Sequence, residues 1–406
     1  MKNKNFWIDF SVLNLCITAF LGMVLRSKML FNMPFLDFNN LLEAHYHFAI
    51  AGWVTLVLMV LMTGVFFWDS ASNKPFYRWL FAGIAISSWS MLIVFYFMGN
   101  CTLAEFFSFF FILITYVFGW MFIKDILKAK VSRTVLFLSI LAIVCLILSS
   151  GGTLMLTYLF SVKSLSAILY RDALYTYLHF TYNGFFTLAV FSLLIHKIWN
   201  DISSLAKRNV HSFSILLCCS ILPSLFLSFL WQDPNIIFRV LAISGSVLLL
   251  LTLVWFIISL ISLRANIRTL SPLIRNTGLV SMSAFMLKLL LQSFTIYTPI
   301  GNAVFGDRPL IIGYLHLVFL VFVTLFILIY FVQEGILDIK NRFTKGALIT
   351  FTIGVVLNEA ILISQGLGAI FIKSSHFFPS LLWFTSIIIF IGATLIGFVR
   401  GKANSA

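Results

Sequence analysis

Histidines stand in apolar surroundings in three stretches of the sequence. The stretches are Glu43-Ala44-His45-Tyr46-His47, Tyr177-Leu178-His179 and Gly313-Tyr314-Leu315-His316. An ionisable side chain is expensive at membrane depth, so its presence there indicates a functional site. A neutral imidazole is the commonest side-chain ligand of transition metals, and it also binds haem iron. The stretches therefore predict a metal or haem site, with an interhelical hydrogen bond as the alternative for any single histidine.

Two polar residues follow His179 at helical spacing. Tyr182 and Asn183 come at i+3 and i+4, on the same face of a helix. We expect an imidazole, a phenol and an amide to meet there, and all three are candidate metal-site residues. Gly184 then permits the close approach of a neighbouring helix or of a flat macrocycle, and both readings stay open. Tyr182 alternatively belongs to an interfacial aromatic belt.

His45 and His47 cannot serve one centre together without distortion. Their positions differ by about 200° around a helix. One of them is expected to face the interior of a bundle, and the other to face a neighbouring helix or a second site.

The amino-acid composition indicates which class of protein holds these residues. The 406 residues are 61% hydrophobic and 10% charged, whereas about a quarter of a soluble domain is charged. The chain is thus a polytopic membrane protein whose partner is the lipid bilayer. The 27 Lys and Arg against 13 Asp and Glu then reflect basic cytoplasmic loops, and no nucleic acid is predicted as a partner.

Twelve apolar stretches are long enough to cross about 30 Å of hydrocarbon. Lipid requires every backbone polar group to pair within its own segment, so we predict an all-α fold with twelve transmembrane helices. The short connections predict a single transmembrane domain over 1–406, without an internal repeat. The predicted spans are 6–25, 42–68, 76–98, 102–124, 134–160, 173–196, 210–231, 236–262, 277–298, 309–333, 346–371 and 378–399.

The basic residues also predict orientation. With twelve spans, most Lys and Arg fall on the side of the N-terminus, so a multi-pass protein of the cell (inner) membrane with both termini cytoplasmic is expected. Spans two, six and ten then begin outside, and their histidines lie about 5 to 12 Å below the outer surface. His196 and His211 fall at cytoplasmic helix ends and His376 in an outer loop.

These features resemble the haem-copper oxidase subunit I superfamily, and in size the NnrS-type haem- and copper-containing membrane proteins. Those families share twelve helices, cytoplasmic termini and metal-binding histidines near the outer ends of helices two, six and ten. Their helix-two histidine and the last histidine of helix ten bind a low-spin haem. The resemblance implies a haem-copper-oxidase-like bundle, and a b-type haem held by His45 or His47 together with His316.

The resemblance also implies a second, non-haem metal at His179, either copper or another metal. In the related reductases a glutamate and a glycine follow this histidine at i+4 and i+5, where this chain has Asn183 and Gly184. The adjacent helix-seven histidines of the family are replaced by Cys218-Cys219, and the residue at the high-spin haem position is Tyr314. Oxygen or nitric-oxide reduction is therefore expected to be negligible, and enzymatic activity is left open.

Five other residues are candidates for supporting roles. Arg171 and Arg308, which are expected in outer loops, are candidates to hold the propionate groups of a haem. Glu105 is a candidate to orient the ring of a histidine. Lys288 and Glu359 lie at mid-membrane depth, where they form either a structural ion pair or a proton-relay step.

Two functions follow. The first is a haem- or metal-binding redox protein in electron transfer, metal or haem handling, or nitric-oxide stress, which implies an electron donor or redox partner. The second is a twelve-helix proton-coupled secondary transporter that uses the histidines, Lys288 and Glu359. Transporters place substrate groups at the midplane in broken helices, so histidines near one face favour the first function.

Overall fold

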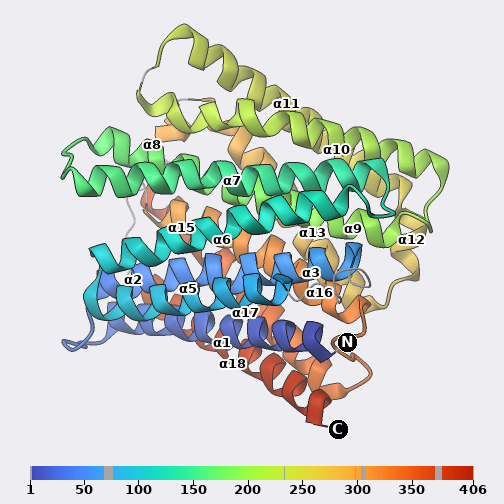
Figure 1. Cartoon of the computed structure of the whole chain (residues 1–406), viewed down its shortest axis with the longest axis horizontal. Helices are drawn as coiled ribbons and strands as arrows, with labels where there is room; N and C mark the ends of the chain where they lie inside the picture. Colours follow the sequence, from blue (N-terminus) through green and yellow to red (C-terminus); the bar gives the residue numbers. More distant parts are fainter. Residues whose placement is uncertain are drawn as a thin grey trace. The chain divides into compact units, whose positions relative to one another are not determined.

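Twelve helices in the described part of the chain are long and apolar enough to cross a membrane, which confirms the predicted all-α, twelve-span architecture. The structure is a computed structural model that describes residues 2–67, 76–232, 234–297, 299–302, 308–370 and 377–405. Its helices (Figure 1) are α1 (Lys2–Leu30), α2 (Phe38–His47), η1 (Phe48–Thr55), α3 (Leu56–Phe66), α5 (Phe76–Met98), α6 (Thr102–Ile126), α7 (Arg133–Ser161), α8 (Ala167–Leu178), η2 (His179–Phe186), α9 (Thr187–Ile198), α10 (Ser204–Leu225), η3 (Phe226–Gln232), α11 (Ile236–Ser262), α12 (Arg264–Thr269), α13 (Pro272–Phe294), α15 (Arg308–His316), η4 (Leu317–Thr324), α16 (Leu325–Gln333), α17 (Arg342–Ile370) and α18 (Phe377–Ser405).

Side-chain caps set where several helices begin. The hydroxyl groups of Ser132, Ser166 and Ser203 accept the backbone N–H three residues later, at the starts of α7, α8 and α10. Two of these starts lie well before the predicted spans, at Ala167 and Ser204. The apolar pattern marks only the lipid-crossing part of a helix, so it misses the polar turns that a cap adds.

Spans two, six and ten share an irregularity that other described spans lack. Each consists of an α segment, an eight-residue π segment and a second α segment, and the π segments are η1, η2 and η4. The π-helix is rare, and it occurs mostly as short insertions in α-helices. Its recurrence in every fourth span is a structural repeat that the sequence analysis did not find.

The same three spans are the most buried. In the most apolar window of each, 89%, 83% and 72% of the residues are buried for spans two, six and ten, against 56% or fewer in every other described span. A helix that is apolar all round and buried on every side belongs to the interior of a bundle.

The chain divides into two compact units, and each is described by itself. The first combines Met1–Phe118 with Thr324–Ala406, and the second is Gly119–Val323. In the first unit α1 packs against α18 and span two, α18 against α17, and α2 against α5. In the second, α7 packs against span six, and α11 packs against α10 and α13. The predicted single domain stays a prediction.

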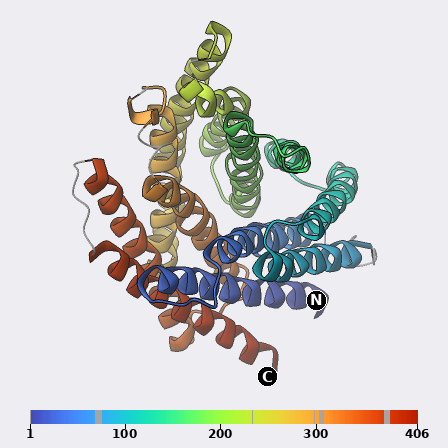
Figure 2. The same cartoon turned by 90° about the vertical axis from the view of Figure 1, so that its left-hand side faces the viewer.

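A partly buried ion pair joins the two ends of the chain within the first unit. Arg400 donates through Nε to Asp9 Oδ1 at 2.5 Å and through Nη1 to Ile336 O at 2.9 Å. The start of α1 and the end of α18 therefore lie at the same end of this unit (Figure 2), as an even number of spans requires.

Candidate functional site

The predicted histidines lie where the α segments meet the π segments. His47 ends α2, His179 begins η2 and His316 ends α15. A π segment inside an α-helix occurs frequently at functional sites. The three histidine stretches singled out by the sequence thus share one structural setting, at the start of the irregular turn in each of the three most buried spans.

Polar side chains hold carbonyl groups of these π segments. Asn14 Nδ2 on α1 donates to Gly52 O at 2.7 Å, and Ser281 Oγ on α13 donates to Phe322 O at 2.7 Å. These bonds matter because a widened helical turn redirects carbonyl groups, and lipid offers them no partner. Sequence reasoning missed Asn14 and Ser281, although a buried polar residue in an apolar span is a readable signal.

Contacts within each unit also link the π segments to one another. In the second unit the ring of Tyr182, three residues after His179, packs edge-to-face on Phe319, three residues after His316, at 6.2 Å between centroids. In the first unit Trp53 Nε1 donates to Thr324 Oγ1 at 3.1 Å. Tyr182 is therefore an interior residue and not part of an aromatic belt.

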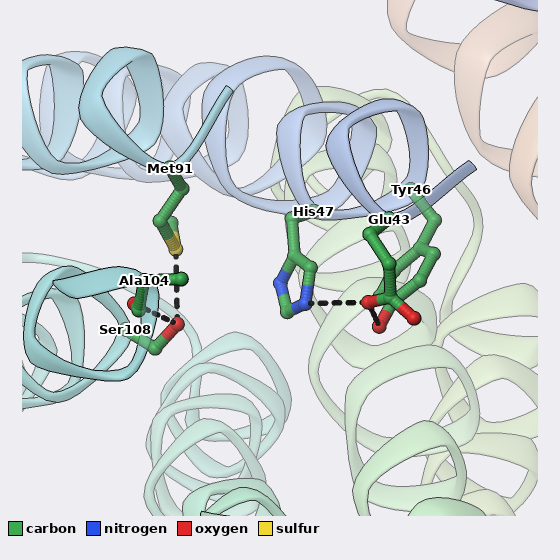
Figure 3. Close-up of polar contacts among 6 residues, drawn as sticks. All are labelled: Glu43, Tyr46, His47, Met91, Ala104 and Ser108. Carbon is green, nitrogen blue, oxygen red and sulfur yellow. Dashed lines mark hydrogen bonds and ion pairs between the residues drawn. The ribbon is translucent and has the colours of Figure 1, made fainter. Parts of the chain in front are cut away.

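His47 lies between a carboxylate and an aromatic ring. Figure 3 shows Glu43 Oε2 facing His47 Nε2 at 3.7 Å, while the hydroxyl group of Tyr46 donates to the same oxygen. The imidazole stacks on Phe95 of α5 with 4.3 Å between centroids and 5° between planes. His47 therefore faces α5, and Glu43 is its carboxylate neighbour.

The close-up also shows how α6 joins this region. Ser108 Oγ donates to Ala104 O at 3.0 Å and lies 3.4 Å from Met91 Sδ of α5 (Figure 3). Glu105, on the same helix, is near enough to act electrostatically on Glu43. The orienting role predicted for Glu105 at a histidine stays a prediction.

His45 contacts α1. A Cβ atom added at Gly22 would lie 3.3 Å from His45 Cε1, so the glycine makes room for the ring. The two histidines of span two thus face different helices, as their spacing predicts. Gly22 could not be found from the sequence, because its role depends on a contact between spans.

His179 has both ring nitrogens engaged. Asn183 Nδ2 lies 3.1 Å from Nδ1, and Ile221 O of α10 lies 2.8 Å from Nε2. An amide nitrogen only donates and a carbonyl oxygen only accepts, so Nδ1 is the acceptor and Nε2 carries the proton. The structure shows the contact of Asn183 with His179, while the predicted meeting of Tyr182 with them and their role at a metal stay predictions.

The close neighbour of Gly184 is a helix. A Cβ atom at Gly184 would lie 2.5 Å from Cys145 Cβ and 2.8 Å from its Sγ, so α7 packs directly on η2. This contact favours the packing alternative over a macrocycle at that face.

His316 has its tautomer fixed by the backbone. Its Nδ1 lies 2.8 Å from Ile312 O, so Nδ1 carries the proton and Nε2 keeps its lone pair. Histidines that bind a metal through Nε2 commonly donate their other N–H in this way.

The two arginines predicted in outer loops are in helices. Arg171 lies in α8, with its guanidinium carbon 4.0 Å from the centroid of Trp231 and 5.6 Å from that of Tyr175. Arg308 is the first residue of α15 and is exposed. The loop placement was wrong because both helices extend beyond their apolar windows. The propionate role of both arginines stays a prediction.

Lys288 and Glu359 are buried in different units. Lys288 on α13 is 1% exposed, and its Nζ lies 5.6 Å from the ring centroid of Phe285. Glu359 on α17 is 5% exposed, and its Oε1 accepts from Asn358 Nδ2 at 3.1 Å. Their predicted ion pair stays a prediction, and so does the convergence of His45 and His47 with His179 and His316.

Neither of the other two described histidines, His196 and His211, lies in or beside a π segment. His211 Nδ1 lies 2.9 Å from Thr134 Oγ1, His196 lies near the end of α9, and His376 falls outside the described residues. In the described part of the chain no group of three or more His, Cys, Asp or Glu side chains is arranged to hold a metal ion.

Comparisons with known proteins add no relative. No protein-family model matches the chain. No curated protein matches it either.

Proposed function

We propose that this chain is an integral membrane haem-binding protein of the haem-copper-oxidase-like class. Its role would be in electron transfer, in haem or metal handling, or in the response to nitric-oxide stress. The supporting observation is that the three most buried spans each place a histidine at the start of a π segment. Such segments are frequent at functional sites.

The haem keeps the ligands that the resemblance implies, His316 and one histidine of span two, and each histidine is assessed within its own unit. His316 donates through Nδ1 to Ile312 O, which is the tautomer that a histidine binding metal through Nε2 commonly adopts. On span two, His45 fits better than His47, because His47 is stacked on Phe95 and faces Glu43. A bound b-type haem would supply one-electron redox chemistry, and an electron donor is then required as a partner.

Copper at His179 is not part of this proposal. A metal ligand needs one ring nitrogen with an available lone pair, whereas His179 donates to Ile221 O and accepts from Asn183. Copper would require Asn183 to give up its contact. We expect that replacing His179 leaves the haem content unchanged.

The proposal includes a location. We place the chain in the cell membrane with both termini in the cytoplasm, because this orientation puts most basic residues inside. The contact between Asp9 and Arg400 supports termini on one common side. A C-terminal reporter that is active only outside the cytoplasm would overturn the orientation.

The transporter remains the second candidate. Two ionisable residues buried in the spans, Lys288 and Glu359, favour it. Against it, the π segments keep spans two, six and ten helical through their centres, whereas transporter sites usually use unwound helices.

Haem content separates the two functions. The full-length protein, purified in detergent, should contain haem and show sharp b-type absorption bands when reduced. His316→Ala should remove these bands, while His211→Ala, within α10 and beside Thr134, should retain them. Protein that carries no haem, even after reconstitution with haem, would sink the haem function and favour the transporter.

A further inference from the structure

Glu359 is a buried carboxyl group of the first unit. It lies within α17, is 5% exposed, and accepts one hydrogen bond, from the side chain of Asn358 to Oε1. Its other oxygen, Oε2, is buried and has no hydrogen-bond partner among the described residues. Within this unit no described cation forms an ion pair with it. A buried polar atom without a partner requires an explanation.

The charged groups on the packed helices do not neutralise Glu359. Arg26 of α1 acts on it electrostatically. Lys28 of α1 donates to Met33 O, and Arg400 of α18 is paired with Asp9. The other described basic residues of α17, Arg342 and Lys345, are exposed at its first turn. An isolated ionised carboxylate in such surroundings is costly, and a group in this position usually becomes neutral instead.

We propose that Glu359 is a proton-binding site inside the membrane. The neutral acid removes the buried charge and keeps the one hydrogen bond seen. Asn358 donates to Oε1, which is then the carbonyl oxygen, and Oε2 carries the proton. This inference goes beyond haem binding and does not depend on it, because every contact used lies within the first unit and none involves a histidine.

A hydrophobic carbodiimide tests the site directly. A protonated carboxyl group adds across one C=N bond of the reagent, and its proton moves to nitrogen. The acyl group then migrates from oxygen to nitrogen and leaves a stable N-acylurea. Nothing is released and no redox partner is needed. We expect dicyclohexylcarbodiimide to add once per chain, on the peptide that contains Glu359, and a water-soluble carbodiimide to leave that peptide unmodified.

The full-length chain in membranes is treated with the reagent, digested and mapped by mass spectrometry. Labelling should fall as pH rises, since only the protonated acid reacts. Glu359→Gln should abolish the adduct, and Glu105→Gln, which removes another carboxyl group within a span, should preserve it. Arg26→Gln should extend labelling to higher pH, because it removes a cation that favours the carboxylate.

Mapping of the unmutated chain keeps the test valid even if a variant folds poorly. No adduct on Glu359 at any pH at which the protein stays folded would overturn the proposal, and so would an equal adduct in Glu359→Gln. Absence of haem would leave this result unaffected, so the two proposals fail separately.

Discussion

Two adjacent glycines of α7 allow the packing of span six to be tested. A Cβ atom at Gly152 would lie 2.4 Å from Ala173 O and 2.6 Å from Tyr177 N, which are backbone atoms of α8. At Gly151 a Cβ atom meets nothing within 4 Å. Ordinary contact begins at 3.4 Å, so Gly152→Ala would push α7 and α8 apart by about 1 Å, an overpacking that typically costs about 1–3 kcal/mol.

The two alanine variants isolate this cost. Alanine is more favourable than glycine in a helix by about 1 kcal/mol, and both variants receive this gain. Gly152→Ala should therefore be less stable than Gly151→Ala by about 1–3 kcal/mol. We expect a difference near the upper end of this range, because the atoms that the new methyl group meets belong to the backbone of α8 and cannot rotate away. The free energy of unfolding in mixed micelles, titrated with a denaturing detergent, measures the difference. Equal stability of the two variants would refute the close approach of α7 and α8.

Three further predictions concern contacts near the π segments and the chain ends. Ser281→Ala removes the bond to Phe322 O and should lower the free energy of unfolding by about 0.6 kcal/mol, whereas Ser283→Ala, at an exposed position, should not change it. Gly22→Leu should displace His45 and reduce the haem absorption bands. Gly346→Leu, where the added side chain meets open space, should retain these bands. Unchanged bands in Gly22→Leu would exclude His45 as a ligand. Asp9→Asn should destabilise the protein by about 1–3 kcal/mol, a value between those for exposed and buried ion pairs. A midpoint of thermal unfolding equal to that of the unmutated chain would contradict the stabilising role of the ion pair with Arg400.

The spans could be predicted because lipid constrains them strongly. Apolar stretches of sufficient length have few alternatives to a helix, so all twelve were found. The π segments could not be predicted. Phe48–Thr55 and Leu317–Thr324 are apolar or small throughout, so no polar stripe shows whether a turn contains the usual number of residues.

The candidate site was predictable in its residue types and less so in its contacts. The contact of Asn183 with His179 follows from their spacing within one helix. The contacts of His45 with Gly22 and of His179 with Ile221 join different spans, and helical spacing carries no information about them. Arg171 was placed in a loop although Ser166 offers a readable helix cap, because the apolar window begins only after it.

Electron paramagnetic resonance of the oxidised protein tests the central claim most directly, since it reports the ligands of the haem iron. We predict a low-spin ferric signal from the purified full-length chain, as expected when two imidazoles bind the iron. His316→Ala and His45→Ala should convert this signal to high spin or abolish it, and His179→Ala and His47→Ala should leave it unchanged. A chain without a haem signal, or a low-spin signal that persists in His316→Ala, would contradict the account.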